Sequence, residues 1–170
     1  TILSKFPKSF NIIGLYTVDS FDKESGVWKD RSPAGNDLTV TNGAIDGKHV
    51  TGTTESVITF PENILPPEYT FGYIAKYNGP AKERIFTGKK SNWLSGFWKG
   101  QTGVAHHHEW ITLDHSELDN NLDIIAVDTN NTMRTNKTPV TLDTIQQTPL
   151  LDSANINVND GIIPGRPDWD

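Results

Sequence analysis

Cysteine is absent from this chain, which excludes disulfide bonds and thiolate metal sites. Positive charge is scarce as well, because 15 Lys and Arg residues against 21 Asp and Glu leave a formal net charge of −6. Binding to nucleic-acid phosphates needs a surplus of Lys and Arg, so we expect no nucleic-acid partner and no attraction to an anionic membrane surface. No stretch comes near the roughly 20 consecutive apolar residues of a membrane-spanning helix, so we also expect no membrane insertion.

The length of 170 residues suits one domain with a hydrophobic core and is short for two. We expect residues 1–10 to form a linker and residues 11–170 to form that domain. The chain begins at Thr1 without an initiator Met, and Trp169 stands next to its last residue. A bulky aromatic residue so near the end is typical of packed structure, so we interpret the chain as a fragment of a longer polypeptide. A naturally short chain with a docked tail is the alternative.

Short apolar segments separated by turn residues predict strands. The clearest is the segment 69–77, in which aromatic and apolar side chains recur at every second position and so share one strand face: Tyr69, Phe71, Tyr73, Ala75 and Tyr77. Further strands are expected at residues 11–19, 38–41, 48–50, 56–60, 132–136, 138–142 and 155–159, with a turn region at 22–36 and a rigid Pro-rich loop at 61–67.

The segment 122–127 is apolar on both faces apart from Asp123, which predicts a central strand covered on both sides. Asn130 and Asn131 then supply a hairpin turn into the next strand. One short helical turn near residues 116–120 is the only helix we expect. Many short strands with turns between them predict an all-β sandwich or barrel.

Residues 84–112 hold three of the five tryptophans, Trp93, Trp98 and Trp110, in apolar bursts broken by Gly, Lys and Ser. Nothing in this stretch recurs at a spacing of three or four residues, so it predicts short strands joined by tight turns. Such a stretch favours a displayed surface over a site that runs a reaction.

Several segments resemble laminin G-like domains of the concanavalin A-like group. Residues 26–37, Gly-Val-Trp-Lys-Asp-Arg-Ser-Pro-Ala-Gly-Asn-Asp, are similar to the Trp-x-Asp-x-Ser-Gly-x-Gly-Asn turn of that family. The end of the strand at 58–61, the aromatic strand at 69–77, and the segments 84–88, 92–98 and 103–107 fit the same pattern. The form Asn-Trp-Leu-Ser-Gly-Phe-Trp at 92–98 is similar to modules in structural proteins of large DNA viruses and phages.

The resemblance implies a jelly-roll sandwich of two antiparallel sheets, in a protein of a virion surface or the extracellular space. Two departures matter. His108 and Glu109 stand where the family often has Asn-Gly, so a longer or strained turn is expected there. The chain also ends at Asp170, where the family's final strand begins, so we expect the sheet to lack its last strand in this chain. Another segment of the parent protein could supply that strand.

The tryptophans in this region are candidates for a sugar-binding surface. Indole rings stack on the apolar faces of pyranose rings, while neighbouring polar side chains bond to the hydroxyls. The candidate glycan-binding residues are Lys90, Asn92, Trp93, Trp98, Lys99, Gln101, His107 and Trp110. The alternative for each tryptophan is a core position in the sandwich.

Two kinds of metal site deserve a hypothesis. His106 and His108 would share a strand face and could bind a transition metal with His115 or Asp114, although polar residues entering a turn explain the run of histidines better. Calcium is the better candidate cofactor, because laminin G-like domains often hold it through loop carboxylates. Its candidate ligands here are Asp114, Asp119 and Asp123, although turns also require Asp and Asn.

Enzymatic activity is the least favoured functional hypothesis. A retaining glycosidase needs two carboxylates about 5–5.5 Å apart, which residues two apart on one strand can supply. On a catalytic strand this gives a Glu-x-Asp-x-Glu pattern, which does not occur in the chain, and Glu109 and Asp114 have the wrong spacing to share a face. The sequence therefore predicts a non-catalytic module that binds a glycan or host surface as part of a virion or cell-surface protein. The alternative is a structural capsid or fibre domain that packs against other subunits or segments of the assembly.

Overall fold

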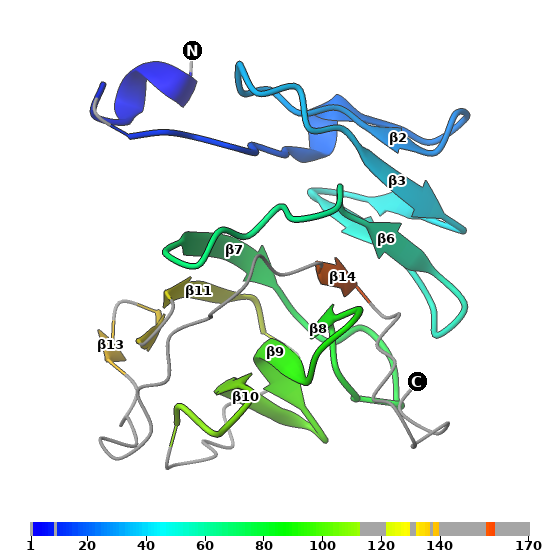
Figure 1. The fold of residues 1–170 in the computed structure, drawn as a ribbon. Coiled ribbons are helices and arrows are strands. Elements are labelled where there is room, and N and C mark those ends of the chain that lie inside the picture. Colours follow the sequence, from blue (N-terminus) through cyan, green and yellow to red (C-terminus); the bar gives the residue numbers. More distant parts are fainter. Residues whose placement is uncertain are drawn as a thin grey trace. The chain divides into compact units, whose positions relative to one another are not determined.

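The computed structural model describes residues 2–8, 10–112, 122–129, 132–136, 138–139 and 156–158. The chain divides into two compact units, Thr1–Pro61 and Glu62–Asp170. Among the described residues the only helices are two 3₁₀ turns, η1 (Ile2–Lys5) and η2 (Val18–Ser20), and the remaining regular elements are strands (Figure 1). The predicted all-β class is therefore confirmed.

Four strands of the first unit are antiparallel neighbours in the order β1-β2-β3-β6. Their bounds are Phe21–Asp22 for β1, Val27–Trp28 for β2, Leu38–Thr41 for β3 and Val57–Thr59 for β6. A separate hairpin joins β4 (Ala44–Asp46) to β5 (His49–Thr51). The strands predicted at 38–41, 48–50 and 56–60 are thus present, and β1 and β2 lie in the region expected to be turns.

The segment 11–17, which the sequence predicts to be a strand, has no regular secondary structure. Side chains of the Trp-Lys-Asp turn hold its backbone instead. The Asp30 carboxylate accepts hydrogen bonds from the Leu15 amide (2.8 Å), the Ser32 amide and hydroxyl (both 2.7 Å) and the Asn36 amide (2.8 Å). The Asn36 side chain donates to the Ile13 carbonyl at 2.6 Å. The backbone groups of Ile13 and Leu15 therefore bond to residues 30–36, mostly through side chains, and not to a neighbouring strand.

The second unit contains two antiparallel sheets. One has the order β14-β8-β9-β10, with β8 at Phe86–Gly88, β9 at Trp93–Trp98, β10 at Gln101–His107 and β14 at Ile156–Val158. The other has the order β13-β12-β11-β7, with β7 at Thr70–Ala75, β11 at Ile124–Thr129, β12 at Met133–Thr135 and β13 at Thr138–Pro139.

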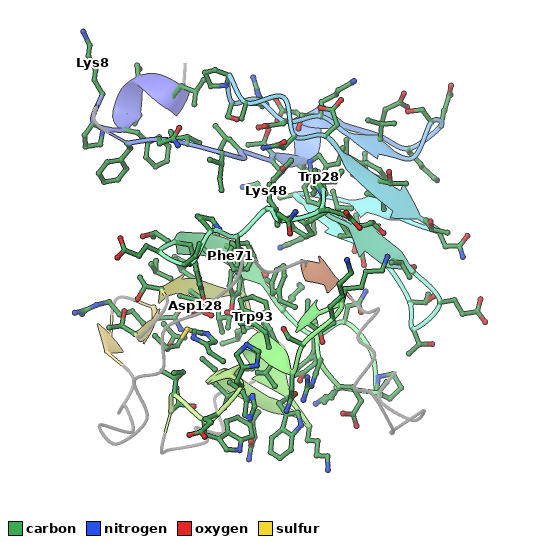
Figure 2. All side chains as sticks on the ribbon, in the orientation of Figure 1. Lys8, Trp28, Lys48, Phe71, Trp93 and Asp128 are labelled. Carbon is green, nitrogen blue, oxygen red and sulfur yellow. The ribbon has the colours of Figure 1, made fainter. Side chains whose placement is uncertain are left out.

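The two sheets of this unit pack face to face. Phe71 on β7 lies edge-on to Phe86 on β8, with ring centroids 5.1 Å apart, and also contacts Trp93 on β9. The ring centroids of Tyr77 and Phe97 are 5.0 Å apart. Figure 2 shows Phe71, Trp93 and Asp128 gathered in this interior. The second unit is therefore a β-sandwich whose core is largely aromatic.

The alternation predicted for residues 69–77 is confirmed, because Tyr69 and Tyr77 are buried while Thr70, Gly72, Ile74 and Lys76 are exposed. β11 lies between β7 and β12, as expected of a central strand. The prediction that both of its faces are covered is wrong, because Ile125 is 47% exposed and Leu122 just before the strand is 63% exposed. The β11–β12 hairpin is present.

Several predictions fall on parts of the chain outside the described residues. These are the helical turn at 116–120, the hairpin residues Asn130 and Asn131, the strand residues 140–142, and the chain end at Trp169 where a final strand was expected to begin.

Candidate functional site: two faces of the β9–β10 hairpin

The tryptophan-rich segment forms the hairpin of β9 and β10. Its two-residue turn, Lys99 and Gly100, has φ angles of 47° and 79°, the left-handed pair that tight hairpins favour. Trp93 lies opposite His107 and Leu94 opposite His106 in the register. Because successive side chains of a strand point to opposite faces, His107 and His106 leave the hairpin on different sides.

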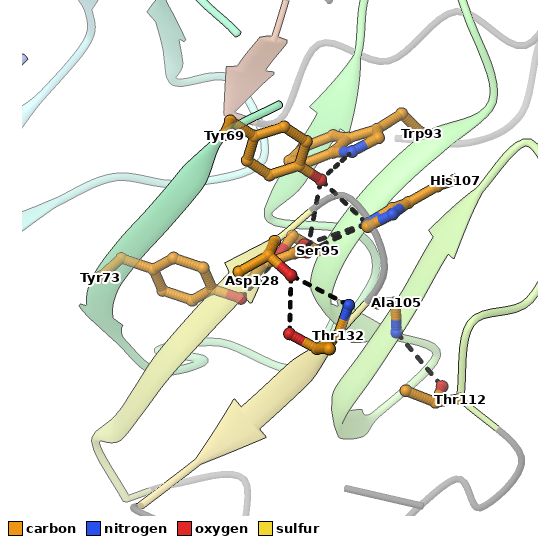
Figure 3. A network of polar contacts seen from close by, with 10 residues as sticks. Tyr69, Tyr73, Trp93, Ser95, Ala105, His107, Thr112, Asp128 and Thr132 are labelled. Carbon is orange, nitrogen blue, oxygen red and sulfur yellow. Dashed lines mark hydrogen bonds and ion pairs between the residues drawn. The ribbon is translucent and has the colours of Figure 1, made fainter. Parts of the chain in front are cut away.

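On the inner face, four side chains form a buried polar cluster, Tyr69, Trp93, His107 and Asp128 (Figure 3). The Trp93 indole donates to the Tyr69 hydroxyl at 3.1 Å, and that hydroxyl donates to Asp128 Oδ1 at 3.3 Å. His107 Nε2 lies 3.1 and 3.2 Å from the two carboxylate oxygens of Asp128. The His107 ring also stacks on Trp93, with centroids 5.8 Å apart and planes 12° apart. We call these four residues the inner cluster.

A second polar contact joins the sheets beside the inner cluster. The Tyr73 and Ser95 hydroxyls are 3.0 Å apart, and Gly96 lies directly against the tyrosine hydroxyl, so that a side chain at Gly96 would collide with it. Burial, and then the negative charge of Asp128, raise the pKa of both Tyr69 and Tyr73 above the ordinary phenol value. Both phenols therefore stay protonated; Tyr69 donates to Asp128, and Tyr73 shares a hydrogen bond with the Ser95 hydroxyl of the other sheet.

The inner cluster contains a His–Asp pair, which is a combination used in proton transfer. The side chains of His107 and Asp128 are both 0% exposed, and Trp93 is 0% exposed as well. A substrate in solvent has no access to these atoms in this structure. The hydrogen bonds instead satisfy polar groups that would be costly to bury alone, so the cluster joins the two sheets.

On the outer face, three rings form a row of Trp98, Trp110 and His106, which we call the outer row. Trp98 and Trp110 meet edge to face with centroids 5.0 Å apart, and His106 meets Trp110 in the same way, also at 5.0 Å. Both tryptophans are half-buried, so part of each ring system remains at the surface. The Lys99 ammonium lies 5.1 Å from the centre of the Trp98 ring, a cation–π contact.

His106 is anchored at the other end of the outer row. Its Nδ1 lies 2.7 Å from the Asn92 carbonyl oxygen, and the Asn92 side chain accepts a 2.8 Å hydrogen bond from Arg84. Burial lowers the pKa of His106, and the positive charge of Arg84 contributes in the same direction, while the bond to Asn92 opposes the shift. His106 is therefore held as a neutral ring beneath Trp110 at neutral pH.

The predicted glycan-binding residues separate into three groups. Trp98, Lys99, Gln101 and Trp110 come together at the outer row or beside it, since Gln101 lies opposite Trp98 across the hairpin. Asn92 joins through its contact with His106. Lys90 is an exposed residue whose ammonium lies 3.6 Å from the Glu62 carboxylate.

Two of the predicted site residues require correction. Trp93 and His107 have no exposed surface, because both point into the sandwich from the inner face of the hairpin. Neither side chain is able to touch a ligand at the surface. His106 takes the place of His107 beside the tryptophans, and the signal was in the sequence, because adjacent strand residues must face opposite ways.

The metal hypotheses find little support in the part of the chain that is described. No group of three or more His, Cys, Asp or Glu side chains there is arranged to hold a metal ion. His108 is exposed and has a φ of 70°, which fits the strained turn expected at that position. Among the calcium candidates Asp123 is exposed just before β11, whereas Asp114 and Asp119 lie outside the described residues, as does His115.

Comparison of the chain with protein-family models, with curated proteins and with solved structures found no match in any of the three. Among the described residues, no helix has the length and apolar character needed to cross a membrane.

Proposed function

We propose that this protein is a non-catalytic module that binds a glycan through the outer row. The observation that carries the proposal is the pair of half-buried tryptophans, Trp98 and Trp110, whose rings meet edge to face at the end of β9 and just after β10. Aromatic rings of this kind stack on the apolar faces of sugars. Aromatic side chains that gather at a protein surface are a common feature of binding sites.

Polar groups suited to sugar hydroxyls lie beside the rings. Gln101 lies opposite Trp98 in the register and is partly exposed, so its side-chain amide is a candidate partner for a ligand hydroxyl. Lys99 covers one side of Trp98 and could donate to the same ligand. The absence of solvent access to the His107–Asp128 pair supports a binding role over catalysis.

The proposal also covers the fold type of the module, its location and the class of glycan that it binds. The resemblance to laminin G-like domains favours a jelly-roll arrangement, a virion surface or extracellular location, and a host or partner glycan as the ligand. Calcium bound through loop carboxylates stays a candidate cofactor on the same ground. Binding at one such surface is expected to be weak and to gain strength from repeated display.

A glycan array with purified protein tests the proposal. The parent protein should give signal for at least one glycan, and Trp98→Ala and Trp110→Ala should each weaken that binding about tenfold or more, as is usual for central tryptophans of an interface. Trp98→Phe should retain part of the affinity because it keeps a ring.

Phe10→Ala is the matched control, because Phe10 is an aromatic residue that is 61% exposed outside the hairpin. Circular dichroism must show that each variant keeps the parent's β structure. A silent array with folded parent protein, or parent-like binding by both tryptophan variants, would contradict the proposal.

A structural module that acts by protein–protein packing is the second candidate. The observation that favours it is the exposure of apolar residues on the four-stranded sheet, where Ile74 is 63% and Ile125 is 47% exposed. These two residues lie directly opposite each other on β7 and β11. A silent glycan array together with self-association of the protein would favour this candidate.

A further inference from the structure

β7 is an outer strand of the four-stranded sheet. It pairs with β11 along six residues, and no other described strand pairs with its second edge. An outer strand carries unpaired amide and carbonyl groups that match the edge of another strand. Proteins often protect such edges with charged residues, so the side chains along β7 decide what the edge is suited to meet.

The exposed face of β7 has a simple order. Counting outward from Gly72 at every second residue, the exposed positions are Thr70 and Ile74 within β7, and then Glu68, in the bend before the strand, and Lys76, directly after it. The negative and positive residues are thus equally far from Gly72, on opposite sides of it. Neither forms an ion pair with another described residue. A strand of this kind is complementary in charge to an antiparallel copy of itself.

We propose that the edge of β7 pairs with the same edge of a second copy of this chain. The strands run antiparallel about a two-fold axis at Gly72, so that Gly72 lies opposite Gly72, Thr70 opposite Ile74, and Glu68 opposite Lys76. Two-fold symmetry produces the Glu68–Lys76 contact twice. Cross-strand pairs of opposite charge stabilise pairing, whereas like charges oppose it.

The residues at the axis suit this register. Gly72 has no side chain, and a Cβ atom placed there would have only the Ala126 carbonyl oxygen nearby, at 3.9 Å. The two copies can therefore approach closely where their strands cross the axis. Ile74 keeps its apolar contact surface with Ile125 and gains the Thr70 methyl group of the other copy. This proposal is independent of glycan binding, although a dimer would display two outer rows and strengthen a weak site.

Charge reversal at the two ends of the strand tests the proposal. Analytical ultracentrifugation over a range of concentrations should show the parent protein in a monomer–dimer equilibrium. Glu68→Lys and Lys76→Glu should each raise the dissociation constant roughly tenfold, because each places like charges together at two symmetric positions. The double variant E68K/K76E restores opposite charges at both and should return to within about twofold of the parent.

Glu109→Lys is the control, because it makes the same change of charge at an exposed position after β10 and should leave the dissociation constant unchanged. Circular dichroism confirms that the variants are folded. The proposal is overturned by a parent that is monomeric at every concentration, or by a dimer that neither single variant weakens. Failure of the double variant to recover also overturns it, because another partner or register would then lie at the edge.

Discussion

Two tryptophan–histidine pairs lie on opposite faces of one hairpin and differ in almost every property. Trp93 and His107 stack in parallel inside the sandwich and are both 0% exposed. Trp110 and His106 meet edge to face on the outside, where the tryptophan is half-buried. His106 and His107 are neighbours in the sequence, so residue type alone does not decide which pair holds the fold and which forms a surface.

The hydrogen-bond partners account for the difference. His107 has the Asp128 carboxylate and the Tyr69 hydroxyl within 3.2 Å, both supplied by the opposite sheet. These partners compensate for taking the ring out of water. His106, which is 8% exposed, bonds instead to the Asn92 carbonyl just before β9 and contacts the half-buried Trp110. The inner pair therefore bonds to side chains of the opposite sheet, whereas the outer pair joins β10 to the segment that follows it.

The largest expected effect is a difference in the free energy of unfolding between variants of the inner and the outer tryptophan. Trp93→Ala should lower the free energy of unfolding by about 3–5 kcal/mol, because it removes a fully buried ring and leaves a cavity. Trp110→Ala should cost about 1 kcal/mol, because its ring is partly solvated already. Urea unfolding followed by circular dichroism measures both. Equal losses would show that the outer row is part of the core.

Removal of the shared carboxylate is expected to have the next largest effect. Asp128→Ala leaves His107 and Tyr69 without their common acceptor in a buried site and should cost about 3 kcal/mol. Asp128→Asn keeps one acceptor oxygen and should cost about 1–2 kcal/mol. The comparison is made by the same unfolding measurement, with glycan binding of the folded variants as a second readout. A loss of binding without a loss of stability would place a function in the inner cluster.

The short-range pattern of the sequence predicts many of the strands and which of their side chains are buried. The alternation in residues 69–77 predicts which side chains of β7 are buried. Trp93 and Trp98 are five positions apart on β9, an odd separation that places them on opposite faces. The sequence prediction placed both tryptophans in one binding surface and did not take this odd separation into account. The hydrogen-bond partners of His107 could not be predicted from local sequence pattern, because Tyr69 is 38 residues away and Asp128 is 21 residues away.

Local sequence pattern also does not predict where hydrogen bonds to a turn replace the pairing of a strand with its neighbour. The segment 11–17 has the apolar content of a strand, yet the Leu15 amide donates to Asp30 and the Leu15 carbonyl accepts from the Arg31 amide. Burial raises the pKa of Asp30, but the hydrogen bonds it accepts outweigh that effect and hold the pKa below its ordinary value. The resemblance identified the Asp30 turn as a motif without showing that its carboxylate organises a second segment.

The smallest expected effect concerns pH and the outer pair. Burial holds the pKa of His106 below its ordinary value of 6.5, so the unfolded chain binds the proton more readily than the folded one. The stability that neutral His106 contributes is present above about pH 6.5 and is lost as the pH falls through the folded pKa. Coulombic repulsion from Arg84, His107 and His108 disfavours charge on the His106 ring, whereas the hydrogen bond to the Asn92 carbonyl favours it.

Between about pH 7.5 and about pH 5.5, the parent should therefore lose unfolding free energy relative to His106→Phe, which keeps a ring but does not titrate. The other histidines are present in both proteins, so the difference between the two profiles isolates His106. Glycan binding by the parent should weaken over the same range, because the imidazolium that forms beneath Trp110 lies close to Arg84. Parallel pH profiles for parent and variant would show that His106 makes no contribution to the pH dependence of stability.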